Sequence, residues 1–176
     1  INGATGALTA IGMPVATANL HPRSIAMAGS LVFVAVTDFV NDNKLLTFRV
    51  DTTVPSVTLT DTRTLPAGGG YTSSVDVNGQ GTMVVATVAG PSTLSLYTVD
   101  HAASALVEVS TSPTVVLTNP RTARFNPAGT FLFTANISSD TVSVFGVTSA
   151  GVVTEQTGSP YVTGGTTATG LAIDAL

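Results

Sequence analysis

Self-similarity at a period of about 48 residues constrains the fold of this chain more than any other feature of its sequence. Four short strand-like segments begin successive units, at spacings of 50, 48 and 48 residues. They are Ser24–Met27, Ser74–Val77, Thr122–Phe125 and Gly170–Ile173. Units of roughly 40–50 residues that contain several short strands are typical of β-propeller blades.

Three further strands follow the first one in each complete unit. All are rich in Val, Thr, Leu and Phe, and turn residues separate them, so the sequence predicts an all-β fold of four-stranded antiparallel blades. The second strands are predicted at Leu31–Val36, Met83–Val88 and Phe131–Asn136, the third at Leu45–Val50, Leu94–Val99 and Val142–Val147, and the fourth at Val57–Leu59, Leu106–Glu108 and Val152–Thr154.

The chain is therefore expected to form one propeller segment over residues 1–176. Its complete blades are predicted near 22–62, 72–110 and 120–157, with a stray fourth strand near 6–11 and a stray first strand near 168–174. Three blades do not close a ring, because propellers use about 4–8. We expect the ring to be completed by further blades of a longer chain or by homo-oligomer partners.

The composition excludes several classes of protein. The net charge is −4, which argues against a nucleic-acid partner, since such proteins carry a basic face. The longest apolar run, Leu31–Val36, is far too short for membrane insertion as a helix. There is no cysteine, and we expect no cofactor; the run Gly68–Gly70 lacks the Lys-Ser/Thr and the helix of a phosphate-binding loop.

The first residue is Ile1 rather than Met, and no signal peptide is visible in the sequence, so the chain is expected to be processed or to be a piece of a longer protein. Only 9% of its residues are charged, Thr and Ser are abundant, and cysteine is absent. These features favour a secreted, periplasmic or cell-surface location.

The stretch Asn119–Val147 resembles the repeat of the lactonase-type (YVTN-repeat) β-propellers, which include bacterial phosphogluconolactonases and muconate-lactonising enzymes. The motifs that carry the resemblance are Pro120-Arg121, Phe125-Asn126-Pro127, Gly129–Phe133, Ala135-Asn136 and Thr141–Phe145. The resemblance implies a seven-bladed propeller with a site at the mouth of its channel. It is strong in the third unit, moderate in the first, and limited to the strand pattern in the second.

In enzymes of this family the motif reads Pro-Arg-His at the start of a first strand and Asn-Glu at the end of the second. Here Arg121 occupies the arginine position, Thr122 the histidine position and Ile137 the glutamate position. Neither Thr nor Ile titrates near neutral pH, so neither can act as a general acid or base. Catalysis by this part of the family's site is therefore in question.

Arg23 and Arg121 each follow a proline at equivalent positions, so both are expected on the same rim of the channel. They are candidates for binding an anion; the alternative is that each guanidinium holds loop carbonyls of adjacent blades. His21 precedes Pro22 near the same rim and is a candidate base or ligand, although an unclustered histidine is more often a surface residue.

Two further groups of charged residues are candidates for binding. Asp76 and Arg124 occupy matching first-strand positions, where they either line the channel for a ligand or pair with each other across adjacent blades. Asp38 and Asp42 lie in an Asx-rich loop, where their oxygens are weak candidates for a metal and ordinary candidates for turn formation.

Three functions remain open on the sequence. The first is a non-catalytic exported or cell-surface propeller that serves as a binding or assembly scaffold. The alternative is a lactonase-type hydrolase, or a ring-opening or ring-closing enzyme, that acts on a sugar lactone or similar small acid, with Arg121, Arg23 and His21 at its site. The third is a structural subunit that polymerises by exchange of edge strands.

Overall fold

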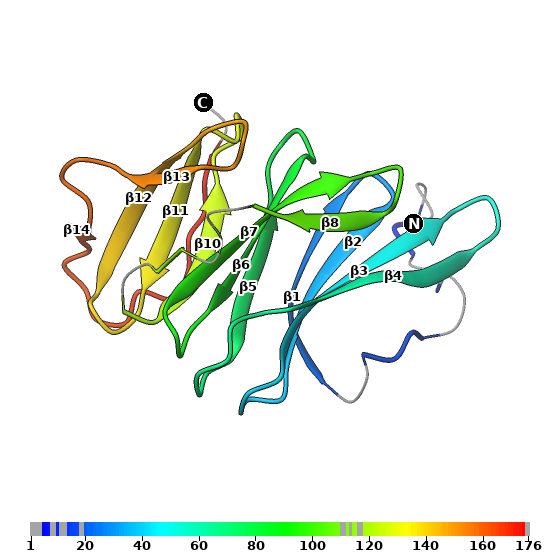
Figure 1. Ribbon diagram of the computed structural model, residues 1–176, viewed down its shortest axis with the longest axis horizontal. Helices are drawn as coiled ribbons and strands as arrows, with labels where there is room; N and C mark the ends of the chain where they lie inside the picture. The colour runs from blue at the N-terminus through cyan, green and yellow to red at the C-terminus, as the bar shows by residue number, and fades with distance from the viewer. Residues whose placement is uncertain are drawn as a thin grey trace.

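Every regular element in the described part of the chain is a β-strand. The computed structural model describes residues 5–7, 10, 14–17, 20–109, 112, 114–115 and 118–174. The strands form three antiparallel sheets, here called blades 1, 2 and 3, which lie side by side with the green blade 2 between the other two (Figure 1). The predicted all-β fold of four-stranded antiparallel blades is confirmed.

The three blades follow one another along the chain. Blade 1 contains β1 (His21–Ala28), β2 (Leu31–Thr37), β3 (Asn43–Asp51) and β4 (Ser56–Thr64). Blade 2 contains β5 (Thr72–Val77), β6 (Met83–Val88), β7 (Thr93–Asp100), β8 (Ala105–Glu108) and β9 (Thr114–Val115). Blade 3 contains β10 (Pro120–Phe125), β11 (Phe131–Asn136), β12 (Thr141–Val147), β13 (Val153–Glu155) and β14 (Tyr161–Val162).

Strand order within each blade follows the chain, and the fourth strand differs among blades. In blade 1 the fourth strand β4 is continuous and pairs with β3. In blade 2 it is split, because β8 and β9 both pair with β7. Blade 3 repeats this arrangement, with β13 and β14 both paired to β12. No helix in the described residues has the length and apolar character needed to cross a membrane.

Of the two stray strands predicted at the ends of the chain, only the C-terminal one lies wholly within the described residues. Residues 8, 9 and 11 of the predicted fourth strand near 6–11 lie outside the described residues. The segment 168–174 is described, and it has no regular secondary structure. The first strand of a blade is held by the second strand of the same blade, and the described residues contain no second strand after segment 168–174. This segment instead contacts blade 3, where Thr122 Oγ1 donates a hydrogen bond to Thr169 O at 2.8 Å.

The second strand of the middle blade, β6, is buried on both faces, as its continuous apolar sequence predicts. All six residues of β6 are buried, and Val84 and Val85, which point to opposite faces, are both fully buried. β6 packs against blade 1 through one face and against blade 3 through the other. A polar side chain in the middle of this strand would therefore face an apolar neighbour on either side.

Apolar clusters between adjacent blades hold the blades together. The cluster between blades 1 and 2 includes Phe33 and Tyr97, and the cluster between blades 2 and 3 includes Phe125 and Phe145. Full burial of one such side chain contributes about 1.5–3 kcal/mol. The first strands β1, β5 and β10 are neighbours in this packing, so their starting residues are brought close together.

Candidate functional site

The first strand of every blade carries a β-bulge near its start. The register with the second strand skips one residue in each blade, and the skipped residues are Arg23, Ser73 and Arg121. A bulge leaves its extra residue unpaired and changes the direction in which the side chain points. The two arginines that the sequence places at equivalent positions are therefore both bulge residues.

Both bulge arginines converge on one aromatic ring, that of Tyr71. The guanidinium carbon of Arg23 lies 5.4 Å from the centroid of the Tyr71 ring, and that of Arg121 lies 5.1 Å from it. Arg121 Nη1 also donates a hydrogen bond to the Tyr71 hydroxyl. Blade 1 and blade 3 thus each supply one cation to a tyrosine at the entrance of blade 2.

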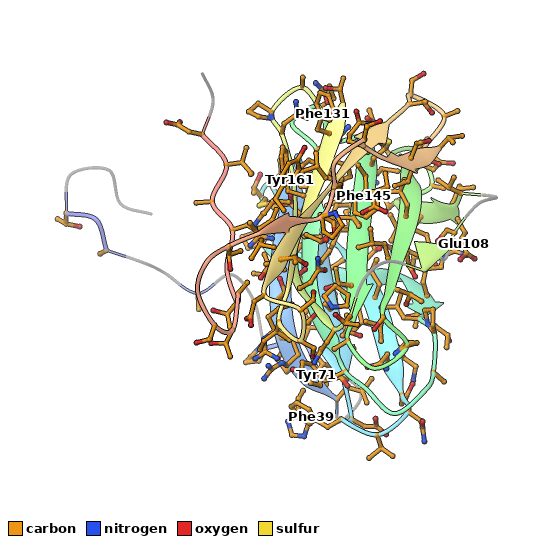
Figure 2. All side chains as sticks on the ribbon, turned by 90° about the vertical axis from the view of Figure 1, so that its left-hand side faces the viewer. Phe39, Tyr71, Glu108, Phe131, Phe145 and Tyr161 are labelled. Carbon is orange, nitrogen blue, oxygen red and sulfur yellow. The ribbon has the colours of Figure 1, made fainter. Side chains whose placement is uncertain are left out.

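Phe39 and His21 complete this group, called here the rim cluster (His21, Arg23, Phe39, Tyr71 and Arg121). The Phe39 ring lies 6.1 Å from the Tyr71 ring and 5.1 Å from the His21 ring. The Arg23 guanidinium carbon lies 5.3 Å from the Phe39 centroid. Phe39 and Tyr71 lie at the same end of the blades, and Phe131 lies at the other (Figure 2).

The positive charge of the rim cluster is not neutralised within the described residues. The ion pairs found there are Lys44–Asp42, Arg63–Asp61 and Arg124–Asp76, and none involves Arg23 or Arg121. The two guanidinium groups face aromatic rings instead, each contact contributing about 0.5–1 kcal/mol at an exposed site. Their remaining N–H donors are available to an anion.

Asp76 and Arg124 face each other across blades 2 and 3. Asp76 Oδ1 lies 3.8 Å from Arg124 Nη1, and Asp76 Oδ2 accepts a hydrogen bond of 2.8 Å from Phe125 N. Arg124 Nη1 also donates to Ala123 O at 3.0 Å. Burial raises the pKa of Asp76, although the Phe125 amide and Arg124 act in the opposite direction. These contacts match the interpretation in which the two residues join adjacent blades.

The positions that hold His and Glu in the resembling enzymes have structural contacts here. Thr122 donates its hydroxyl to Thr169 O, and the backbone N–H of Ile137 donates to Asn119 O at 3.2 Å. Neither side chain titrates near neutral pH. The rim cluster itself contains the imidazole of His21, which lies against the Phe39 ring.

The carboxylates proposed as weak metal candidates are engaged in their own loop. Asp38 Oδ1 accepts hydrogen bonds from Val40 N, Asn41 N and Asp42 N at 2.8–2.9 Å, and these bonds lower the pKa of Asp38. Asp42 Oδ2 pairs with Lys44 Nζ at 2.7 Å. Among the described residues, no three His, Asp or Glu side chains gather as a metal site requires.

Tyr71 and Phe39 are not among the site residues expected from the sequence. The repeat contains a signal for Tyr71, because the 50- and 48-residue spacings place His21, Tyr71 and Asn119 at the same position of successive units. The repeat contains no such signal for Phe39. This residue lies in the loop after β2 with a φ of 66°, a conformation uncommon for a bulky residue.

Comparison with known proteins identifies the family. Residues 35–168 match the family model described as lactonase, 7-bladed β-propeller. No protein of curated function matches the chain significantly. The structural neighbours described below are less than 25% identical in sequence, so they bear on the fold alone.

Three solved structures illustrate the likeness. The periplasmic gluconolactonase PpgL of Pseudomonas aeruginosa is 23% identical with a TM-score of 0.65, and the match covers 80% of this chain and 41% of that one. A Bacteroides fragilis protein described as a candidate 6-phosphogluconolactonase is 15% identical with a TM-score of 0.66, covering 77% and 38%. A Lactobacillus plantarum protein is 21% identical with a TM-score of 0.63, covering 82% and 42%.

The match therefore covers only part of each related structure. This chain spans about two fifths of the length of each of these solved structures. The family-model match nevertheless extends over most of the chain, from the end of β2 in blade 1 through blades 2 and 3, and the sheet order agrees with it. The chain belongs to the lactonase family of seven-bladed β-propellers.

Proposed function

We propose that this chain contributes the channel-mouth site of a lactonase-type propeller that binds a sugar lactone or the corresponding anionic sugar acid. The observation that carries the proposal is the convergence of Arg23 and Arg121 on Tyr71 without an acidic partner in the described residues. The gluconolactonase name of the Pseudomonas aeruginosa neighbour is consistent with that ligand class.

The geometry of arginine suits a carboxylate or phosphate. A guanidinium presents parallel N–H donors in a rigid plane, so it forms two charge-assisted hydrogen bonds to one anionic group. Arg121 is held by the Tyr71 hydroxyl, which restricts the freedom that it would otherwise lose on binding. Arg23 is exposed beside Phe39, where it can close over a bound anion.

Hydrolysis of a lactone adds water across the acyl–oxygen bond. The attacking water loses a proton, negative charge develops on the carbonyl oxygen, and the ring oxygen departs and gains a proton. In this proposal His21 takes the proton from water, and the arginines stabilise the developing oxyanion and then hold the carboxylate of the sugar-acid product. Further blades, from the same chain or from a second copy, complete the ring around the site.

A second candidate function is a non-catalytic, exported binding scaffold. The observation in its favour is that Thr122 and Ile137 stand where the resembling enzymes have His and Glu, and that both make contacts within the fold. In this case the same arginine pair binds a sugar acid without turning over a lactone.

The experiment that tests both uses the complete protein. Hydrolysis of glucono-1,5-lactone and related sugar lactones is followed by proton release, and binding of gluconate is followed by calorimetry. We expect Arg121→Ala to reduce kcat/KM by about 10²–10³-fold, the loss typical of one oxyanion-stabilising group. Arg49→Ala is the matched control, because Arg49 bonds to Ser104 Oγ, outside the rim cluster.

The outcomes separate the candidates. Turnover that depends on Arg121 supports the lactonase. Gluconate binding that depends on Arg121, with no turnover of any lactone, supports the scaffold. If gluconate does not bind and no lactone is hydrolysed, both functions are wrong.

A further inference from the structure

A pocket of about 380 Å³ lies between blades 2 and 3, next to the rim cluster. Phe39 and Tyr71 form one part of its lining, and Ser92, Asn119 and Ser138 contribute polar groups. All of the lining residues among those described are uncharged. Its volume falls within the roughly 300–1,000 Å³ of small-molecule sites. The pocket and the arginine pair therefore share the Tyr71 ring but differ in charge.

Two glycines that face each other shape one side of this pocket. A Cβ placed on Gly70 would lie 2.1 Å from Gly90 N, and one placed on Gly90 would lie 2.6 Å from Gly70 N. Such distances are impossible for real side chains, so the two loops meet backbone to backbone. Both glycines line the pocket, and a larger residue at either position would push the two loops apart.

Asn119 has an unusual combination of features for a loop residue. Its φ is 62°, its backbone N–H donates to Ser92 Oγ at 3.1 Å, and its Nδ2 donates to Ser138 Oγ at 3.3 Å. Its Oδ1 is buried and has no hydrogen-bond partner among the described residues. Leaving such an acceptor unpaired costs about 1–3 kcal/mol, and a native structure calls for an explanation of it.

Three of the six non-glycine residues with positive φ in the described part of the chain line the same pocket. Phe39, Ser92 and Asn119 all have φ between 56° and 66°, in the left-handed region that residues other than glycine seldom adopt. Such conformations persist when the surrounding structure enforces them, and they cluster at ligand sites. Strain, an orphaned acceptor and a pair of aromatic rings thus occur together in one pocket.

We propose that this pocket is a subsite for the hydroxyl-bearing, uncharged part of a sugar acid or lactone. The apolar face of the carbon chain or ring packs on Tyr71 and Phe39. Its hydroxyl groups bond to Ser138 Oγ, Ser92 Oγ and the Asn119 amide, whose Oδ1 gains a donor when the loop adjusts to the ligand. The inference rests on the proposed function, because it takes the anionic end of the same ligand to lie at Arg23 and Arg121.

A site that hydrogen-bonds the hydroxyl groups of its ligand discriminates strongly against an analogue without them. The test therefore compares two anions of the same carbon length, gluconate and hexanoate, by calorimetry with the complete protein. We expect gluconate to bind at least about tenfold more tightly. Asn119→Gly and Ser138→Ala should each remove about tenfold from gluconate affinity and leave hexanoate affinity unchanged.

The variants are chosen to keep the fold. Glycine accepts the positive φ of Asn119 without strain, and Ser138 is exposed, so Ser138→Ala remains informative if Asn119→Gly fails to fold. Ser139→Ala is the control, because Ser139 is also exposed and bonds to Thr141 Oγ1 rather than lining the pocket.

Two results would overturn the subsite, and they are distinguishable. If gluconate binding depends on Arg121 but is unchanged in Asn119→Gly and Ser138→Ala, the subsite is wrong and the proposed function stands. If neither anion binds, the proposed function fails and the subsite fails with it.

Discussion

The carboxyl group of Asp76 lies between two blades, where burial raises its pKa above the ordinary 3.8. A raised pKa means that the folded chain binds this proton more tightly than the unfolded chain does, so stability falls as pH rises from 3.8 through the raised value. Asp76→Asn keeps an oxygen for Phe125 N and cannot ionise. We expect this variant to lose that decline and to be at least as stable as the parent at pH 7, as measured by urea unfolding between pH 3.5 and 7.

Asp51 provides the control of opposite sign. Hydrogen bonds from the Thr53 hydroxyl and from the Val54 and Thr53 amides lower its pKa, so its stabilising effect is present above the ordinary value and is lost as pH falls. Asp51→Asn should therefore flatten the acid side of the stability profile. If both substitutions changed the pH dependence of the free energy of unfolding in the same direction, the opposite pKa shifts assigned to Asp76 and Asp51 would be contradicted.

Sequence reasoning at the residue scale found the cations of the rim cluster but not its aromatic rings. Arg23 and Arg121 follow prolines at repeated positions, a signal that a single sequence contains. Phe39 reaches the cluster from a loop after β2, through a positive φ that no sequence pattern specifies. The orphaned Asn119 oxygen is likewise a product of packing, since it depends on what surrounds the loop.

The turns that join first and second strands give a matched comparison at the scale of single elements. In blade 2, Asn78 Oδ1 accepts hydrogen bonds from Thr82 N and Met83 N at 2.8 and 3.0 Å, and Asn78 is buried. In blade 3, Asn126 Oδ1 accepts from Thr130 N and Phe131 N, both at 2.9 Å, in an exposed setting.

We expect Asn78→Ala to destabilise the protein by about 2 kcal/mol and Asn126→Ala by less than about 1 kcal/mol. The reason is that water replaces the lost acceptor at the exposed turn, whereas the buried amide of Met83 is left unpaired. The free energy of unfolding from urea titration measures both. Equal losses would show that burial of the turn does not matter.

Strand periodicity predicted the first three strands of each blade well, because their apolar runs and turn residues are local properties. It was less complete for the fourth strands. The short strands β9 and β14 pair with β7 and β12 after a break, and such pairing depends on contacts with a strand far back in the chain rather than on a local pattern. The segment 168–174 has the sequence of a first strand but none of the described residues supplies its partner.

At the scale of the whole molecule, one position shows how each blade packs on the blade before it. Val75 in blade 2 and Ala123 in blade 3 are 1% and 0% exposed, whereas their blade 1 equivalent, Ile25, is 69% exposed. Ile25 belongs to an apolar groove of about 350 Å³ that also includes Val34 and Phe48. Blade 1 thus presents to its open side the kind of surface that buries a neighbouring blade elsewhere in the chain.

This repetition leads to the expectation that another blade covers Ile25 in the native particle. Burial of an isoleucine contributes about 1.5–3 kcal/mol, so Ile25→Ser should lower stability by at least that much if the face is covered. If it is open to water, the change should stay within about 0.5 kcal/mol, as for other surface substitutions. Val107→Ser is the control, since Val107 is 53% exposed on the outer strand β8.

Urea unfolding measures the loss of stability in Ile25→Ser, and light scattering then shows whether the covering blade belongs to the same chain or to a second copy. A particle that dissociates in Ile25→Ser places the covering blade on a second copy, and an unchanged mass with reduced stability places it on the same chain. Equal effects of the two substitutions would mean that no blade covers this face.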